Sequence, residues 1–267
     1  MALPLPTSLS PSKVSAFKDC ALAFKFSVID RLPEPPTAAA AKGTLVHRAL
    51  ERLHCLAPAE RTPAAARACL DAAVPEVLGS SEYLPLELDE PDRFLAEAAT
   101  LLDRYFELED PTVVQAIGLE LKMEADVGGV RLRGIIDRLD LDADGGLVVT
   151  DYKTGKVPGE RYEQGKLGGV HFYAYLCEAV LGQRPARIQL LYLAQPVAIV
   201  AVPSEQSIRG LQRRVGAIWT AVERACATDD FRPNPGRLCD WCAHKAHCPA
   251  FGGDPRGVTP LVAAGVG

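Results

Sequence analysis

The chain has 267 residues, 48% of them hydrophobic, and a formal net charge of −5. That length and composition suffice for a sizeable core in one large domain or two small ones. No apolar run is long enough to cross a bilayer, and the first residues carry neither a basic segment nor a long apolar stretch. We therefore expect a cytoplasmic protein without membrane contact.

The charge is unevenly distributed. Residues 71–110 contain twelve acidic side chains and two Arg, so the remainder of the chain is net positive. An acidic block of this kind is usually a solvated helical face. Because this block dominates the net charge of the chain, a basic groove elsewhere would not be visible in that sum. The charge therefore permits a nucleic-acid partner without requiring one.

Helices are predicted for the first part of the chain. Ser10-Pro11 offers an N-cap followed by proline at the first helical position, which favours a helix to about Asp30. Apolar periodicity predicts three more helices, at Lys42–Leu56, Thr62–Leu78 and Pro91–Glu109.

Strands dominate the next part. Val113–Val127 and Val130–Leu141 read as strands around Gly128-Gly129, a strong two-residue hairpin turn, and Leu147–Tyr152 reads as a third. The remaining predicted elements are a helix within Gly159–Leu181, strands at Ala186–Ala194 and Val197–Val202, a helix at Ser204–Thr228, and a loop rich in Pro, Gly and Cys. This order predicts an α/β core with a helical N-terminal elaboration.

The hairpins bring three carboxylates into line. The turns set a register in which Glu120 lies opposite Asp137, and Asp137 opposite Asp151. Because side chains alternate along a strand, Lys153 shares the face of Asp151. Aligned carboxylates repel one another, and a bound cation of the Mg²⁺ or Mn²⁺ type would relieve that repulsion. The pattern predicts a metal site, with Lys153 placed to orient or deprotonate an attacking water or to stabilise phosphoryl charge.

The alternative is a surface hairpin whose acidic residues face solvent. Ile135-Ile136 and Val148-Val149 argue against it, because apolar neighbours on both strands indicate a largely buried sheet in which charges need partners. His47 stays open at this point. A single histidine near a helix start is more often packed or exposed than a metal ligand.

Eight cysteines without an export signal point to metal ligands or buried thiols rather than disulfides. Cys239, Cys242 and Cys248 form a compact run, and three thiolates need a fourth ligand for a closed site. Four others lie in apolar helical settings typical of small core residues: Cys55, Cys69, Cys177 and Cys226. Cys20 is the remaining candidate. The alternative is a loop of cysteines that holds no metal.

Two motifs in the strand region resemble a known family. The run GIIDRLD at residues 134–140, followed by TDYKTG at 150–155, resembles the PD-(D/E)xK nuclease superfamily. More narrowly, it looks like the RecB-type exonuclease branch, which includes CRISPR-associated Fe–S nucleases. The resemblance extends from Ser10 to Phe251 and implies a restriction-endonuclease-like core, a mixed central sheet flanked by helices.

The resemblance also implies roles for residues that spacing alone leaves open. The family has a helical histidine as a further metal ligand, and the run GTLVHRALE matches it at His47. The carbonyl of Tyr152 is implied as another metal contact, and Glu120 matches an acidic position before the central hairpin. The family's Gln-x-x-x-Tyr corresponds to His171 and Tyr175, with histidine in the glutamine position, and both are implied to lie near DNA.

For the cysteines, the resemblance implies a structural [4Fe–4S] cluster held by Cys20, Cys239, Cys242 and Cys248, although zinc fits the same four thiolates. Such a cluster would tie the chain ends together across a long loop. We expect one nuclease domain over residues 1–251, with a helical elaboration at about 42–110 and a catalytic core at about 111–228. Its cysteine loop at 229–251 would close on Cys20, ahead of a flexible tail at 252–267.

Two functions remain. The resemblance implies a divalent-metal-dependent deoxyribonuclease, an exonuclease on single-stranded DNA ends in repair or recombination. No G-x-x-x-x-G-K-[ST] motif is present, so unwinding would come from a separate helicase. The alternative is a non-catalytic DNA-end-binding or helicase-associated subunit that keeps the nuclease fold, against which the complete D…D-x-K set argues.

Overall fold

Two compact units make up the fold. The computed structural model describes residues 2–157 and 160–257. Unit 1 draws on Met1–Pro35, Glu124–Arg133 and Arg209–Gly267, and unit 2 on Pro36–Met123 and Gly134–Ile208. No helix among the described residues combines the length and the apolar character needed to cross a bilayer.

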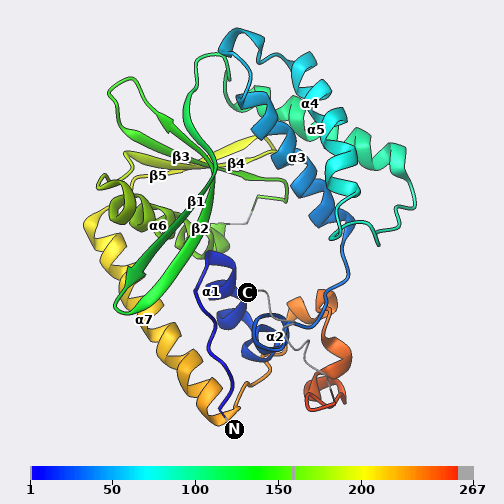
Figure 1. The fold of residues 1–267 in the computed structure, drawn as a ribbon, viewed down its shortest axis with the longest axis vertical. Coiled ribbons are helices and arrows are strands. Elements are labelled where there is room, and N and C mark those ends of the chain that lie inside the picture. The colour runs from blue at the N-terminus through cyan, green and yellow to red at the C-terminus, as the bar shows by residue number, and fades with distance from the viewer. Residues whose placement is uncertain (1, 158–159, 258–267) are drawn as a thin grey trace, which may run out of the picture. The chain divides into compact units, whose positions relative to one another are not determined.

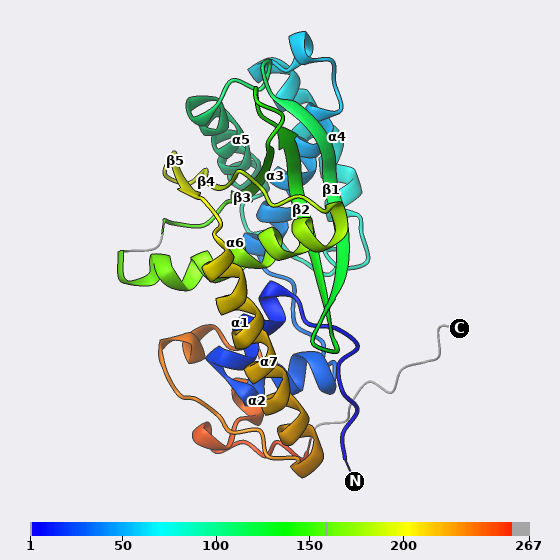
Figure 2. The same ribbon diagram turned by 90° about the vertical axis from the view of Figure 1, so that its left-hand side faces the viewer.

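A five-stranded mixed sheet has the order β1-β2-β3-β4-β5 (Figure 1). Its strands are β1 Gln115–Val127, β2 Val130–Leu141, β3 Leu147–Lys153, β4 Arg187–Tyr192 and β5 Val197–Ala201. β3 and β4 pair in parallel, whereas the β2–β3 and β4–β5 pairs are antiparallel. Figure 2 shows β5 at the side of the sheet away from the long β1–β2 hairpin. The predicted α/β fold with a mixed sheet is confirmed.

Turn chemistry fixes the strand boundaries. Gly128 and Gly129 connect β1 to β2 with φ angles of +54° and +85°. Positive φ at both positions is what a type I′ turn requires, and glycine adopts it at little steric cost. The β2–β3 register pairs Leu141 with Leu147 and Arg138 with Thr150, as the sequence predicts.

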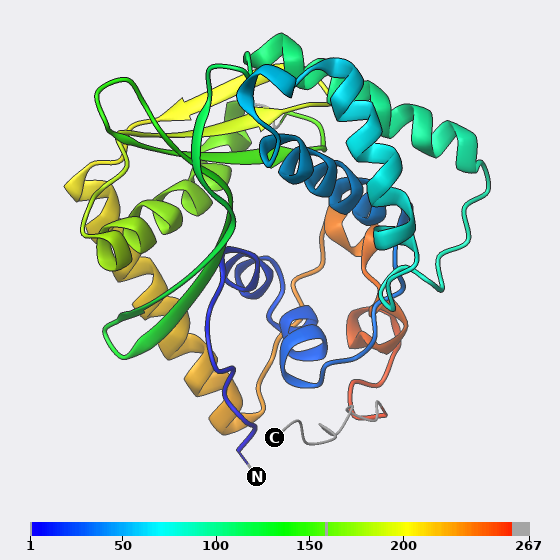
Figure 3. The same ribbon diagram turned by 45° about the horizontal axis from the view of Figure 1, so that its top comes forward.

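Three helices of unit 2 form one bundle: α3 Ala38–His54, α4 Pro63–Leu78 and α5 Pro91–Leu108 (Figure 3). A short 3₁₀ turn, η2 Pro58–Glu60, links α3 to α4. The side chain of Thr37 caps α3, which therefore begins four residues before the predicted start. The bundle shares one apolar core with Tyr152 and Leu191 of the sheet. This packing holds α3, the helix of His47, against β3.

Two further helices span Glu160–Leu181 (α6) and Glu205–Thr228 (α7), close to their predicted positions, although residue 159 lies outside the described residues. α6 approaches β2 at Gly134, where an added Cβ would lie 2.7 Å from Leu176 and 3.3 Å from Tyr173. The missing side chain permits this close approach. It brings the middle of α6 to the strand that carries Asp137.

The continuous first helix predicted from Ser10-Pro11 to about Asp30 is wrong. The structure has α1 Pro11–Asp19, α2 Ala21–Phe24 and a π-helical turn, η1 Lys25–Ile29. Cys20 interrupts them with extended backbone, at φ −159° and ψ 110°. Phe24 and Phe26 are both buried in the core of unit 1. Residues two apart point to nearly opposite sides of a regular helix, and the π turn begins between these two phenylalanines.

The C-terminal segment after α7 contains three short 3₁₀ turns: η3 Arg237–Trp241, η4 Lys245–His247 and η5 Pro249–Phe251. They lie within the predicted cysteine loop. Most of the predicted flexible tail, residues 258–267, lies outside the described residues.

Candidate metal centre and cysteine pocket

Asp137 lies where β2 and β3 part. Along the described strands, the paired stretch ends at Arg138 and Thr150. One residue further, Oδ2 of Asp137 accepts a hydrogen bond from the backbone N–H of Tyr152 at 2.7 Å. The carboxylate thus replaces a backbone carbonyl as the acceptor for that N–H and stands between the two strands.

His47 extends from α3 toward the same point. Its Nε2 lies 3.1 Å from the carbonyl oxygen of Tyr152, and because a carbonyl only accepts, Nε2 carries the proton. Burial lowers the pKa of His47, so the ring is neutral and Nδ1 presents a lone pair. Nδ1 lies 3.5 Å from Oδ2 of Asp137. Two acceptors therefore face each other, an arrangement that a shared cation resolves.

β1 contributes Glu120 through a strained backbone conformation. Its φ of +44° lies in the left-handed region, which costs a non-glycine residue roughly 1–2 kcal/mol. Ligand atoms of His47, Glu120 and Asp137 all lie within 4.8 Å of one another. A helix and two strands thus bring an imidazole and two carboxylates to one place.

The charges in this cluster disfavour one another. Burial, followed by the nearby Asp151 carboxylate, raises the pKa of Asp137 to about 7. Burial and the charge of Asp137 raise the pKa of Glu120. A divalent cation would remove both penalties. Two carboxylates and an imidazole suit Mg²⁺ or Mn²⁺, so the residues present fit the implied metal.

Asp151 and Lys153 form an ion pair beside the cluster. Asp151 is 4% exposed, and its carboxylate contacts the Lys153 ammonium. Burial acts to lower the pKa of Lys153, but Asp151 and Asp137 together with Tyr192 outweigh it, and the pKa of Lys153 is raised. Lys153 is therefore a cation at neutral pH. This favours stabilisation of negative charge over removal of a proton from water.

Tyr173 on α6 is a site residue that the sequence analysis missed. Its hydroxyl hydrogen-bonds to Asp151, and burial together with that carboxylate raises the pKa of Tyr173. The predicted DNA-proximal residues, His171 and Tyr175, lie two positions to either side on α6 and are partly buried. Residues two apart on a helix point in different directions. The sequence did contain a hint of this residue. The run FYAY at residues 172–175 has two tyrosines near the place of the tyrosine in the family's Gln-x-x-x-Tyr motif, and only Tyr175 was considered.

α3 approaches the end of β3 closely at Gly43. An added Cβ there would lie 3.2 Å from Oγ1 of Thr154, so a side chain at this position would require the threonine hydroxyl to move. Gly43 precedes His47 by four residues, so the two lie on one face of the helix. The absent side chain lets that face approach the strand that carries Asp151 and Lys153.

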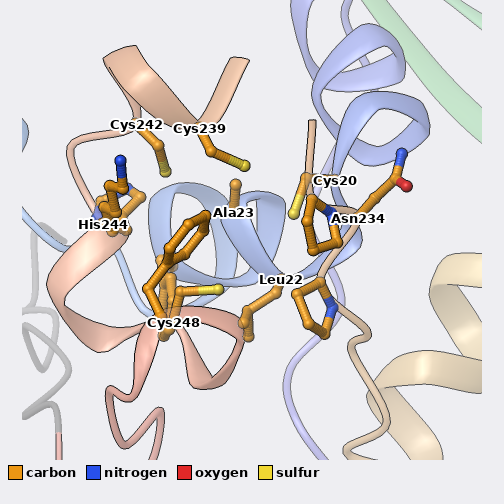
Figure 4. Close-up of a pocket in the computed structure, with 13 residues that line it drawn as sticks. Cys20, Leu22, Ala23, Asn234, Cys239, Cys242, His244 and Cys248 are labelled. Carbon is orange, nitrogen blue, oxygen red and sulfur yellow. The ribbon is translucent and has the colours of Figure 1, made fainter. Parts of the chain in front are cut away.

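In unit 1, four cysteines line one cavity of about 30 Å³: Cys20, Cys239, Cys242 and Cys248 (Figure 4). Their sulfurs point toward a common space, and the extended backbone of Cys20 brings that residue to it. The backbone N–H of Gly236 donates to Sγ of Cys239 at 3.3 Å. Within the described part of the chain, no three of these sulfurs lie within 4.8 Å of one another.

The fold and the acidic cluster define a class of protein: a mixed α/β protein with a candidate divalent-cation site beside a lysine. A family model of the PD-(D/E)XK nuclease superfamily matches residues 8–249. The chain belongs to this superfamily.

Individual relatives are more distant. The Gene 69 protein of Mycobacterium phage L5 is 27% identical over 136 residues, which cover 50% of this chain and 44% of that protein. The chain thus matches less than half the length of this curated relative. A solved structure from Eubacterium rectale, described as a candidate exonuclease, is 13% identical at a TM-score of 0.54, covering 89% of this chain and 88% of its own. The match to the crystal structure of SSO0001 covers 92% of this chain and 87% of that one, at 12% identity and a TM-score of 0.45.

Proposed function

We propose that the chain is a divalent-metal-dependent DNA nuclease. The observation that carries this proposal is the convergence of His47, Glu120 and Asp137 beside the Asp151–Lys153 pair. Membership of a nuclease superfamily supports it. A neutral imidazole, partly buried carboxylates and an ammonium group together suit hydrolysis of a phosphodiester.

Each side chain has a distinct part in this proposal. His47, Glu120 and Asp137 hold the cation, with Asp151 beside them, and the Tyr152 carbonyl accepts from Nε2 of His47, which leaves Nδ1 free for the cation. A divalent cation bound there would supply Lewis-acid stabilisation of the phosphate and a lower pKa for the attacking water. Lys153, kept charged by Asp151, stabilises negative charge on the phosphoryl oxygens.

The finer proposal is exonuclease action on single-stranded DNA ends in repair or recombination. Its support is the RecB-type motif pair, GIIDRLD with TDYKTG, together with a fold shared with the candidate exonuclease from Eubacterium rectale. The sequence has no P-loop motif, so strand separation would come from a partner helicase.

A cleavage assay tests this proposal, with single- and double-stranded DNA labelled at either end and with Mg²⁺, Mn²⁺ or EDTA. We expect cation-dependent shortening of single strands from an end. Asp137→Asn and Lys153→Ala should each lower the rate about 100-fold or more. Asp144→Asn, the same change in an exposed turn residue, should leave the rate unchanged. A protein that binds DNA but cleaves it under none of the metal conditions would contradict the proposed nuclease activity. That result would favour a non-catalytic subunit that binds DNA ends.

We also propose a [4Fe–4S] cluster in the cysteine pocket. Four converging thiols and an N–H···S hydrogen bond to Cys239 support it. No three of these sulfurs, among the described residues, lie within 4.8 Å of one another, whereas zinc bonds of about 2.3 Å would place sulfurs about 3.8 Å apart, and this wider spacing favours a cluster. Protein purified without oxygen should be brown, with about four irons per chain. Cys20→Ser should lose the iron and Cys55→Ser, outside the pocket, should keep it. A colourless wild-type protein with stoichiometric zinc would overturn the assignment.

A further inference from the structure

A buried arginine lies on the side of β2 and β3 turned away from the acidic cluster. Arg138 is fully buried, and each of its nitrogens has a partner. Nε donates to Asp140 at 2.8 Å, and Nη2 donates to Glu109 at 3.0 Å. Nη1 donates to the hydroxyl of Tyr152 at 2.6 Å and to that of Tyr105 at 3.2 Å. Two carboxylates thus balance the charge of the guanidinium and fix its plane.

Tyr152 connects this network to the candidate metal centre. Its side chain is buried with Arg138, while its main chain belongs to the cluster. The backbone N–H donates to Asp137 at 2.7 Å, and the carbonyl accepts from Nε2 of His47 at 3.1 Å. One residue therefore orients a carboxylate and sets the tautomer of an imidazole. The phenol and the two peptide groups thus belong to one residue that is held from both sides of the strand.

We propose that Arg138 is a positioning residue for the metal centre and acts through Tyr152. By holding the phenol, Arg138 fixes the rotation of Tyr152, and with it the orientation of Asp137 and the proton on His47. Groups that orient metal ligands typically change metal affinity or activity by about 10–100-fold when removed. Arg138 touches neither the cation nor the DNA in this account. The inference rests on the proposed function, because it assumes that His47 and Asp137 bind a cation.

The chain offers a matched pair of variants for the test. Tyr152→Phe and Tyr105→Phe each remove one hydroxyl that accepts from Nη1 of Arg138, and both tyrosines are buried. Both variants should lower thermal stability, because both weaken the same network. The backbone of Tyr105 belongs to α5, whereas that of Tyr152 carries the hydrogen bonds to Asp137 and His47. The two variants therefore separate positioning from general stability.

The readouts are Mn²⁺ affinity by titration calorimetry and steady-state cleavage of single-stranded DNA. We expect Tyr152→Phe to weaken Mn²⁺ binding about 10-fold and to lower kcat at subsaturating Mn²⁺, with an unchanged KM for DNA. Tyr105→Phe should keep the wild-type Mn²⁺ affinity. Wild-type affinity in Tyr152→Phe, or an equal loss in both variants, would overturn the positioning role while the nuclease assignment stands. A wild-type protein that neither binds Mn²⁺ nor cleaves DNA would remove the proposed function as well.

Discussion

Single side chains in the acidic cluster are held in states that reduce stability. Glu120 has left-handed backbone, the carboxyl of Asp137 is buried beside another acid, and Nδ1 of His47 faces a second acceptor. Such features persist where the surrounding structure enforces them, and they concentrate at functional sites. Their coincidence at one point is a stronger indication of a metal centre than any one of them.

Replacing Asp137 by Asn should stabilise the metal-free protein at pH 8. The folded-state pKa of Asp137, about 7, exceeds the unfolded value of about 3.9. The folded state therefore binds the proton more tightly, and its stability falls as pH rises from about 4 to about 7. We expect Asp137→Asn to reduce this fall by roughly 2 kcal/mol, measured by urea unfolding in EDTA between pH 5 and pH 8. Added Mn²⁺ should stabilise the wild type and leave the variant unaffected. A variant less stable than wild type at pH 8 would contradict the electrostatic account.

The Glu120→Gly variant should be more stable than the Glu120→Ala variant. Glycine in an ordinary strand is about 0.5–1 kcal/mol less stable than alanine. The φ of +44° at Glu120 reverses that order, because alanine retains the strain and glycine does not. We expect the free energy of unfolding of Glu120→Gly, measured with urea, to be about 1 kcal/mol higher than that of Glu120→Ala. Both variants should lose Mn²⁺ affinity equally. If the alanine variant were the more stable of the two, the backbone at position 120 would not keep its left-handed conformation after substitution.

Among the elements, the end of α3 is tied to the start of β1 by one buried side chain. Arg61 donates to the carbonyls of His54 and Leu56 at the end of α3, and to those of Pro111 and Val114 before β1. A cation at a helix C-terminus also interacts favourably with the helix dipole. Arg61 thus connects the helix of His47 to the strand of Glu120.

Replacing Arg61 by Lys should therefore be costly. Lysine keeps the charge but offers one compact group in place of a planar fork, and it leaves buried carbonyls unpaired. We expect a loss of about 2–4 kcal/mol in thermal or urea unfolding. Arg67→Lys, in an exposed pair with Asp103, is the matched control and should change stability by less than about 0.5 kcal/mol. Equal effects at the two positions would mean that the Arg61 fork adds nothing beyond its charge.

The sequence predicted those elements whose limits are set locally. Glycine pairs and strand alternation determine the hairpin and its register, so β2 begins at Val130 and pairs with β3 as expected. The break at Cys20 has no local signal, because the residues around it pack against distant parts of the chain such as Val222 and Cys226. His47 was placed by family resemblance alone, since its contact with Tyr152 joins residues 105 positions apart. Tyr173 depends on the same kind of long-range packing.

In the molecule as a whole, the cysteine pocket belongs entirely to unit 1 and the acidic cluster to unit 2. Cys20 and Cys248 are partly buried against the core that contains Phe24 and Phe26. Loss of the proposed [4Fe–4S] cluster should therefore loosen unit 1 first, because regions of a protein open with different free energies.

Limited proteolysis of Cys248→Ser tests this expectation. We expect early cleavage within residues 2–35 and 209–257, with a fragment containing α3–α5 still protected. Cys69→Ser, in α4 of unit 2 and outside the pocket, should give the wild-type pattern. Simultaneous cleavage of both units would mean that they unfold together.

Gly43 shows how a missing side chain can set the geometry of a reaction centre. An added Cβ at Gly43 would lie 3.2 Å from Oγ1 of Thr154, just after β3 and one helical turn from the imidazole. A larger residue there would press on the Thr154 hydroxyl and require either that side chain or the helix to shift by a few tenths of an ångström. Where the helix takes up that shift, the imidazole moves relative to the two carboxylates while every donor stays in place, so the residue at position 43 is a means of adjusting the proposed cation site without replacing a ligand.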